Sequence, residues 1–379
     1  MSAAFTGPSR ALGIELYRGS MAYLEALNRA GGINGQPIVI RAYDDEDDPT
    51  LAIRNTIRLV DDDNVLLLMN FVGTPMVTRV LPLLKSYQKR QVYLFFPFSG
   101  GQPHRQPPYF DSVFNLRASY REETQGLVDH LVRVGRTRIA VFYQADAYGR
   151  DGWEGVRDAL ARHGLTIASE ATYRRGTTLS ASLKPQMDIL RAAHPHAIVA
   201  IGSYAASAAL IRDARDSGWT VPIANVSFVG SEAMVDSLRQ LGTPKALDYT
   251  SNLIMSQVVP YHGDVSLPAV REYRERMAEF GAQIAHPGAS DYRPIPYSSV
   301  SLEGFLNAKM LVQILKRMGS VPTRERIRET VERIRDLDLG IGSPISFGPA
   351  QHQGSHRVYY ATLEGTRVVP LESWDRWTK

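Results

Sequence analysis

Two apolar stretches decide the fold class: Arg138-Ile139-Ala140-Val141-Phe142-Tyr143 and Ala197-Ile198-Val199-Ala200-Ile201. Between them lie a helical pattern over 151–162, a strand pattern over 166–173 and a second helical pattern over 180–193. Nearly continuous apolar strands that alternate with amphipathic helices are typical of a parallel sheet covered on both faces. The segment therefore predicts one α/β lobe.

The same alternation of strands and helices extends toward both ends of the chain. Toward the N-terminus we expect strands at 37–40, 65–69 and 92–96 and helices at 50–60 and after Gly73; toward the C-terminus, a helix at 205–216 and a strand at 221–224. Two runs of similar size predict two α/β lobes, and 379 residues exceed one ordinary core.

Beyond residue 250 the pattern changes. We expect a strand or hinge segment at 252–259, helices at 268–280, 298–318 and 323–335, and a hairpin at 358–371 that turns at Glu364-Gly365. These elements cannot build a third sheet. They are predicted to complete the two lobes, so that the chain crosses between the lobes more than once.

Composition excludes several classes of protein. Hydrophobic residues make up 44% and charged residues 22%, as in ordinary globular proteins. No apolar stretch is long enough to span a membrane, and arginines are scattered among acids, which argues against a nucleic-acid-binding face. Because there is no cysteine, disulfides, cysteine-bound zinc and thiol catalysis are excluded.

The sequence also lacks the motifs of common catalytic and cofactor-binding sites. The sequence lacks the fingerprints of dinucleotide, P-loop and nucleophile-elbow sites. His194-Pro195-His196 is interpreted as a surface turn rather than a zinc site. The acids at 44–48 are interpreted as a solvated loop rather than a calcium site, and the charges at 324–335 as an exposed helix face laced with ion pairs. We therefore predict no catalytic residue, no metal and no cofactor.

Polar and aromatic residues follow the predicted strands. In open parallel sheets, ligands bind outside the carboxyl ends of the strands. A single aromatic residue at such a position is more often part of the core than of a ligand site, but a set gathered at strand ends favours a ligand site, because core residues need not gather there. The candidates from the two runs are Phe71, Thr74, Phe98, Ser99, Gly100, Tyr148, Tyr204, Ser227 and Phe228.

A set of short motifs then resembles the type I periplasmic binding proteins of the leucine/isoleucine/valine-binding family, which serve branched-chain amino-acid ABC importers. The matches occur in family order over almost the whole chain. They are Phe5-Thr6-Gly7-Pro8, the run 27–35 with Tyr43-Asp44-Asp45 and Pro49, Asp146-Ala147-Tyr148-Gly149-Arg150, Glu303-Gly304-Phe305-Leu306 and the run 344–349.

The resemblance implies an α/β fold of two Rossmann-like lobes joined by a three-segment hinge, with a ligand cleft between them that closes on the solute. It implies crossovers near 118–122, 252–258 and 343–347. Lobe I would then hold residues 1–120 plus 256–345, and lobe II residues 121–255 plus 346–379. It further implies a periplasmic location, a permease and ATPase subunits as partners, no direct membrane insertion and no enzymatic activity.

Carried over residue by residue, the resemblance places ligand contacts of the first lobe at Gly73-Thr74 and at Phe98-Ser99-Gly100. Contacts of the second lobe fall at Tyr148, Tyr204 and Ser227. Hydroxyl groups and backbone N–H groups of the first lobe would hold a carboxylate.

Two departures from the family bear on the ligand. Ser227 stands where amino-acid binders commonly have an acid for the α-ammonium, and an ammonium buried without a counter-charge is costly. Glu232 could substitute only if its loop folds back. Phe98 adds apolar surface where the family is usually small. We therefore expect an aromatic or bulky apolar ligand with one polar or carboxylate end, rather than a free amino acid.

The N-terminus leaves an alternative open. Residues 1–8 show no signal peptide and are interpreted as a short edge strand, or as the continuation of a strand and export signal lying upstream. Without an export signal, the same fold would suit a cytosolic ligand sensor similar to the amide-responsive regulators. An enzyme working in the cleft is a third possibility, with no nucleophile–base pair behind it.

Overall fold

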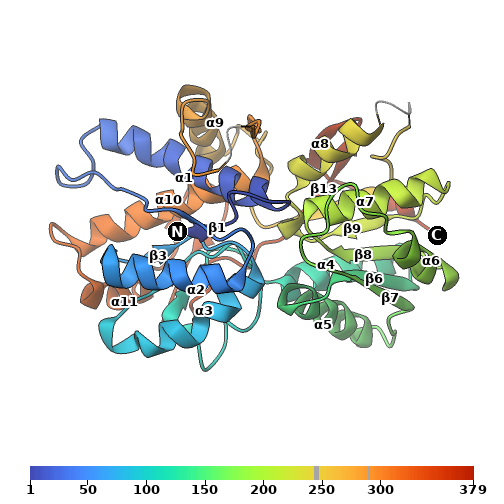
Figure 1. Cartoon of the computed structure of the whole chain (residues 1–379), viewed down its shortest axis with the longest axis horizontal. Helices are drawn as coiled ribbons and strands as arrows, with labels where there is room; N and C mark the ends of the chain where they lie inside the picture. Colours follow the sequence, from blue (N-terminus) through green and yellow to red (C-terminus); the bar gives the residue numbers. More distant parts are fainter. Residues whose placement is uncertain (243–246, 289–290) are drawn as a thin grey trace. The chain divides into compact units, whose positions relative to one another are not determined.

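A computed structural model describes residues 1–242, 247–288 and 291–379. The chain forms two compact units (Figure 1): unit 1 comprises Met1–Ala118 and His262–Arg357, and unit 2 comprises Ser119–Tyr261 and Val358–Lys379. The chain thus passes from one unit to the other three times. Compared with the expected boundaries, residues 119–120 and 256–261 belong to unit 2, and residues 346–357 belong to unit 1.

Short parallel strands form the centre of unit 1. β1 pairs with β2, and β3, β4 and β5 form a second ladder in that order. A small antiparallel pair, β11 and β12, lies near the end of the unit. Their bounds are β1 Ser2–Ala3, β2 Tyr43–Asp44, β3 Leu68–Met69, β4 Leu94–Phe95, β5 Val113–Phe114, β11 Leu337–Asp338 and β12 Pro344–Ile345.

In the described residues of unit 1, six α-helices surround these strands. They are α1 Arg10–Arg29, α2 Pro49–Ile57, α3 Thr74–Ser86, α9 Pro268–Phe280, α10 Ser299–Met318 and α11 Arg324–Glu332. Shorter turns are η1 Arg58–Asp62, η2 Gln88–Arg90 and η3 Phe110–Ser112. The core between α2, α3 and the ladder is made of residues such as Leu68, Val77, Leu81 and Leu94, all buried.

α1 and α10 approach each other at two glycines. A Cβ on Gly19 would lie 1.8 Å from the carbonyl oxygen of Ser301, and a Cβ on Gly304 would lie 2.0 Å from that of Leu16. Real Cβ atoms do not come that close to an oxygen, so only glycine permits this contact between the helix backbones.

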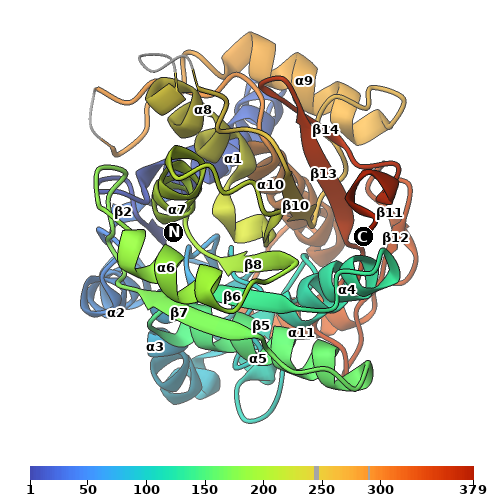
Figure 2. The same ribbon diagram turned by 90° about the vertical axis from the view of Figure 1, so that its right-hand side faces the viewer.

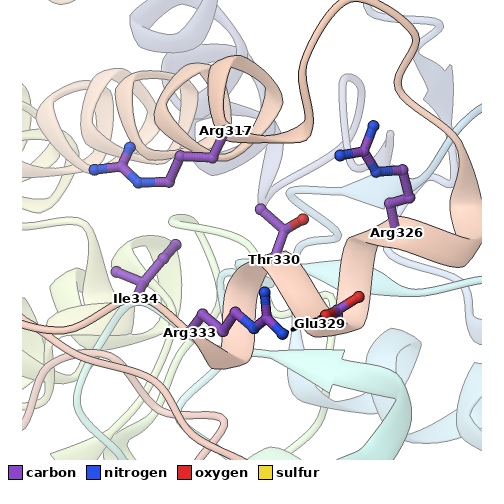
Figure 3. A pocket seen from close by; sticks show the side chains of 6 residues that line it. All are labelled: Arg317, Arg326, Glu329, Thr330, Arg333 and Ile334. Carbon is purple, nitrogen blue, oxygen red and sulfur yellow. Dashed lines mark ion pairs between the residues drawn. The ribbon is translucent and has the colours of Figure 1, made fainter.

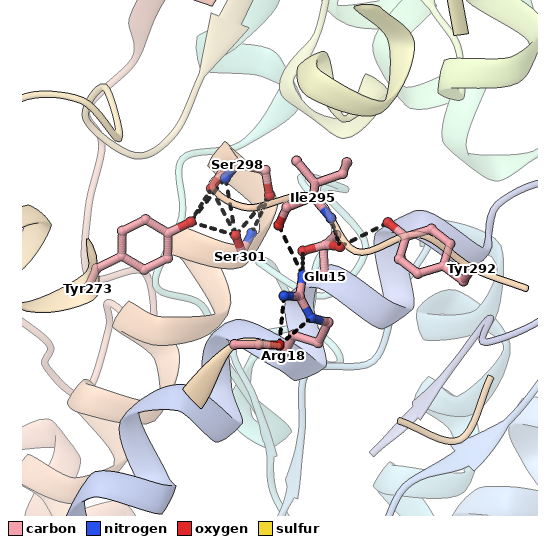
Figure 4. A network of polar contacts seen from close by, with 8 residues as sticks. Glu15, Arg18, Tyr273, Tyr292, Ile295, Ser298 and Ser301 are labelled. Carbon is pink, nitrogen blue, oxygen red and sulfur yellow. Dashed lines mark hydrogen bonds and ion pairs between the residues drawn. The ribbon is translucent and has the colours of Figure 1, made fainter. Parts of the chain in front are cut away.

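A buried ion pair on α1 holds the segment between α9 and α10 (Figure 4). The Arg18 guanidinium lies 2.6 Å from Glu15 Oε2 and donates to the carbonyl oxygen of Gly281 at 2.8 Å. Glu15 Oε1 accepts from the backbone N–H of Ile295 and from the Tyr292 hydroxyl, both at 2.9 Å. The two charges are therefore satisfied by each other and by polar groups of Gly281, Tyr292 and Ile295, which lie far from α1 in the sequence.

Unit 2 contains one seven-stranded sheet in the order β14-β13-β10-β9-β8-β6-β7, which Figure 2 shows with the β13/β14 hairpin at one edge. Strands β10, β9, β8, β6 and β7 run parallel to one another. In the β13/β14 hairpin, the two strands are antiparallel to each other, and β13 is antiparallel to β10. The bounds are β6 Ile139–Gln144, β7 Ser169–Tyr173, β8 Ala197–Ile201, β9 Ile223–Asn225, β10 Leu253–Gln257, β13 Tyr359–Glu364 and β14 Arg367–Pro370.

Helices cover both faces of this sheet. α6, α7 and α8 share one core cluster with alternate strand residues such as Ile198 and Ala200. Ile201 points to the other face, where a Cβ on Gly152 of α5 would meet its side chain, and α4 packs beside α5. The helices are α4 Tyr120–Arg133, α5 Ala147–Arg162, α6 Lys184–Ala192, α7 Tyr204–Asp216 and α8 Ser231–Gly242, with turns η4 Ser227–Val229 and η6 Asp375–Trp377.

The predicted α/β class and the alternation of elements are confirmed. The helix at 268–280 and the hairpin at 358–371 lie where the pattern predicted them. The expected strand at 37–40 is wrong, because the ladder with β1 begins only at Tyr43. No helix in the described part of the chain is long and apolar enough to cross a bilayer.

One expectation about the first 50 residues is confirmed and one is corrected. β1 is a short strand that pairs with β2 alone, and Ser2 O also accepts from Val72 N at 3.3 Å. The acids at 44–48 are not simply a solvated loop, because Asp45 is fully buried and accepts from Ser2 Oγ at 2.7 Å. Asp44 accepts from Thr6 Oγ1 at 2.6 Å.

Candidate functional site

The candidate residues of unit 1 follow β3 and β4. A parallel bridge between Val72 and Phe98 extends this ladder beyond the strand ends and aligns the two loops. Gly73 then turns the chain with φ of 94°, and α3 begins at Thr74. As a result Thr74 Oγ1 lies 2.8 Å from Ser99 Oγ, with both side chains buried. The structure thus brings together two hydroxyl groups that the sequence separates by 25 positions.

The neighbouring candidates in this unit have different surroundings. The Phe71 ring belongs to the core cluster of unit 1. Gly101, next to Gly100, is held so tightly that a Cβ there would lie 2.8 Å from the Thr74 methyl group and 3.4 Å from Ser99 Oγ. The loop after β4 therefore wraps closely around the hydroxyl pair.

Basic side chains that the sequence analysis missed surround this loop. Arg105 donates to the Ser99 carbonyl oxygen at 3.0 Å, and His104 Nε2 lies 3.3 Å from the same atom. Burial and the neighbouring Arg105 hold the pKa of His104 well below its usual range, so the imidazole is neutral. The Arg117 guanidinium lies 4.8 Å from the centre of the Phe98 ring and 3.4 Å from the Glu303 carboxylate.

Arg105 also reaches the segments at which the chain leaves unit 1. Its guanidinium donates to Gln353 Oε1 at 2.9 Å and to the Arg117 carbonyl oxygen at 3.4 Å. Residues 117 and 353 lie close to the changes of unit at 118 and 357. One side chain therefore links the Ser99 loop to two of the three crossovers.

The candidate residues of unit 2 follow β6, β8 and β9. β6 lies between β8 and β7, so the connections after β6 and β8 leave the sheet in opposite directions, as at the ligand crevices of open α/β sheets. Asp146 accepts from the backbone N–H of Tyr148 at 3.0 Å and so begins α5.

Tyr148 is fully buried within unit 2. Its hydroxyl donates to the Gly202 carbonyl oxygen at 3.3 Å, and its ring lies 5.2 Å from Tyr120 and 4.6 Å from Phe228, measured between centroids. Tyr204, the first residue of α7, is only partly buried and packs against the core cluster of the sheet. Tyr148 and Phe228 are thus brought together, whereas Tyr204 lies at a more accessible position.

Ser227 has a partner that the sequence analysis did not identify. The fully buried carboxylate of Glu123 accepts from Ser227 N at 2.7 Å, from Ser227 Oγ at 2.9 Å and from Ser256 Oγ at 2.6 Å. Glu232, the acid considered for this role, lies in the first turn of α8. A helical signal for Glu123 was present: Glu123, Leu127 and Leu131 recur every four residues on the buried face of α4.

A separate hollow lies on α10 and α11 of unit 1 (Figure 3). It has a volume of about 270 Å³ and is lined by Arg317, Arg326, Glu329, Thr330, Arg333 and Ile334. Glu329 pairs with Arg333 at 2.6 Å, and the Arg317 and Arg326 guanidinium groups point in different directions. These charges do not converge on a common point, in line with the predicted ion-paired helix face. Among the described residues, no cluster of three or more His, Asp or Glu side chains could hold a metal ion.

Comparison with known proteins identifies the family. The profile of the family "Periplasmic binding protein" matches residues 1–367. A crystal structure of a possible leucine/isoleucine/valine-binding protein from Rhodopirellula baltica SH 1 is 30% identical, covers 100% of this chain and 96% of that chain, and has a TM-score of 0.87. A substrate-binding periplasmic protein from Ralstonia solanacearum is 28% identical, with 98% of each chain covered and a TM-score of 0.85.

A curated relative, an amino acid binding protein from Pseudomonas aeruginosa, is 27% identical over 218 residues, which is 57% of this chain. That match spans 56% of the relative's own length. The family profile, in contrast, covers nearly all of the sequence, and the resemblance stated from the motifs is confirmed. The chain belongs to the periplasmic binding protein family.

Proposed function

We propose that this protein is the solute-binding component of an ABC-type importer and works in the periplasm with a permease and ATPase subunits. Its family is one of binding proteins rather than enzymes. The observation that carries the proposal is the pairing of Thr74 and Ser99, because two buried hydroxyl groups held 2.8 Å apart at adjoining strand ends suit recognition of a small polar group.

The ligand that we propose is an aromatic or bulky apolar molecule with one polar or carboxylate end, rather than a free amino acid. In unit 1, the hydroxyl pair and the Arg105 and Arg117 guanidinium groups near it favour a carboxylate. In unit 2, the rings of Tyr148 and Phe228 offer apolar contact. We further propose that the two units close on the ligand.

A thermal-shift screen tests the proposal. A ligand at about 100 times its dissociation constant stabilises the folded protein by about 2.7 kcal/mol. We expect aromatic carboxylic acids to raise the melting temperature, and leucine, isoleucine and valine to have little effect. If a free α-amino acid gives the largest shift and aromatic acids give none, the proposed ligand class is wrong.

A further inference from the structure

We propose that an apolar groove of unit 1 is a binding site for one extended strand, which lies parallel to residues 38–41 and is joined directly to Met1. With this strand in place, β1 becomes the last part of a longer inner strand that unites the two small sheets of unit 1. The inference concerns unit 1 alone and is independent of the ligand and the transporter proposed above.

The groove lies beside the N-terminus, close to α10 and β3 (Figure 1). It has a volume of about 160 Å³ and is lined by residues 38–41 and 65–67 together with Met1, Met69, Leu311 and Leu315. Apart from Arg41, all of these side chains are apolar, and Val39 is 69% exposed. The groove therefore suits apolar side chains.

Backbone groups along the groove point to a peptide as the occupant. Within the described part of the chain, no hydrogen bond joins the backbone of Val39, Ile40, Leu66 or Leu67 to another residue. Backbone groups beside apolar surroundings are normally paired, and an extended strand can pair them residue by residue on both of its edges. A small apolar molecule or a helix has no such row of donors and acceptors to offer.

The hydrogen bonds of β1 set the register of this strand. β1 runs parallel to β2, with Ser2 opposite Tyr43. The pattern continues at Met1, because Tyr43 N donates to Met1 O at 3.0 Å and Met1 N donates to Arg41 O at 2.7 Å. Continued backward, it places four added residues opposite 38–41, over about 13 Å. The second residue before Met1 then accepts from the N–H of Arg41.

The separation of the two sheets supports the same arrangement. β1 and β2 form one sheet of unit 1, and β3, β4 and β5 form another. Ser2 O already accepts from Val72 N at 3.3 Å, so β1 touches the chain just beyond β3. A strand between 38–41 and 65–67 extends this contact and gives one sheet in the order β2-β1-β3-β4-β5.

The amino group of Met1 favours a joined strand over a separate peptide. Met1 is buried, and burial lowers the pKa of its α-amino group to about 5, because a charge away from water is costly. A peptide N–H at the same place donates to Arg41 O without carrying a charge. A separate peptide, in contrast, has to end against the amino group.

The test adds four residues directly before Met1 of the full chain, behind the same polar tag in every variant. The variant with Val-Ile-Val-Ile should melt at least about 4 °C above the variant with Gly-Ser-Gly-Ser. Pro-Val-Pro-Ile is the matched control: it is also apolar, but proline has no N–H to donate and is not accepted inside a sheet, so it should melt like Gly-Ser-Gly-Ser.

Hydrogen exchange followed by mass spectrometry locates the added strand. Amide hydrogens of 38–41 and 65–67 should exchange at least about tenfold more slowly in the Val-Ile-Val-Ile variant than in the Gly-Ser-Gly-Ser variant, because paired strand hydrogens are protected. Residues 197–201 of β8 lie in unit 2 and serve as the internal reference, whose exchange should not change.

The outcomes decide both parts of the inference. If the Val-Ile-Val-Ile variant melts no higher than the two controls, or if exchange at 38–41 is not slowed, the groove does not bind a strand. If acetyl-Val-Ile-Val-Ile-amide added to the unextended chain raises its melting temperature equally, the occupant is a separate peptide and the joined strand is wrong. Should the Val-Ile-Val-Ile variant aggregate, as judged by size-exclusion chromatography, Thr-Val-Thr-Val takes its place, because threonine keeps the strand preference and adds hydroxyl groups.

Discussion

The carboxyl group of Asp45 lies wholly inside unit 1, where it accepts from Ser2 Oγ at 2.7 Å and from Asp47 N at 3.2 Å. Burial raises the pKa of Asp45 to about 7. A carboxyl group with a raised pKa in the folded state stabilises the fold fully below the unfolded pKa near 4, and this contribution is lost as the pH rises through 7.

Asp45→Asn should therefore be more stable than the wild type at pH 8, and the difference should shrink toward pH 4. Three pKa units correspond to about 4 kcal/mol in the free energy of unfolding at most. Urea unfolding at several pH values measures this difference in the free energy of unfolding between the variant and the wild type. Glu46→Gln, a change at the exposed neighbouring residue, serves as the control, and equal pH profiles for Asp45→Asn and the wild type would contradict the prediction.

Alanine variants of Tyr204 and Tyr148 should differ in how much they change ligand affinity and how much they change stability. Tyr204 is partly buried, so Tyr204→Ala should weaken binding of an aromatic acid by about 1.5–3 kcal/mol and change the melting temperature little. Tyr148 is fully buried among aromatic rings, so Tyr148→Ala should lower affinity and also cost stability. Calorimetry and thermal melts on both variants test this; normal binding by Tyr204→Ala would show that Tyr204 only packs.

Some residues of the site could be predicted from the sequence and others could not. Thr74 and Ser99 could be proposed as candidates because each follows an apolar strand of the unit 1 ladder, and Tyr148 because it follows an apolar strand of the unit 2 sheet. The contact between Glu123 and Ser227 joins residues 104 positions apart, and no local pattern specifies which helix turn faces which loop. Arg105 lies in a loop without periodicity, so its contact with Ser99 had no signal at all.

At the scale of elements, the close contact of α1 with α10 should reverse the usual effect of replacing a helical glycine by alanine. Replacing glycine by alanine within a helix normally stabilises it by up to about 1 kcal/mol. Here Gly304→Ala should destabilise unit 1 by about 1–3 kcal/mol or more, because the added methyl group would lie 2.0 Å from the Leu16 carbonyl oxygen.

Denaturant unfolding checks the sign of this change. Lys316→Ala, on the exposed side of α10, is a suitable control and should be close to neutral. If Gly304→Ala is as stable as the wild type or more so, the helices do not touch at this glycine.

Long elements were easier to predict than short ones. The helix at 268–280 and the buried strand at 197–201 have strong periodic patterns and lie where expected. The strand predicted at 37–40 failed because its apolar residues do not specify hydrogen bonding, and the ladder with β1 takes only Tyr43 and Asp44. A strand of two residues is too short to show an alternating pattern, so its first and last residues cannot be predicted from the sequence.

At the scale of the whole molecule, we predict that ligand binding closes the two units. Units joined by several chain segments suit a hinge motion, in which a few residues at the crossovers change conformation. Small-angle scattering with saturating ligand should give a smaller radius of gyration than without it. A bound protein with an unchanged scattering curve would rule out closure as the mode of binding.

The threefold passage of the chain between its units also determines when each unit can fold during synthesis. α1 has its close partner in α10, almost 300 residues later, and the sheet of unit 2 ends in the hairpin at 359–370. Neither unit can finish its core until the ribosome has made most of the chain. We therefore expect the nascent chain to leave apolar surface of both units uncovered during most of its translation, which is the kind of surface that chaperones bind.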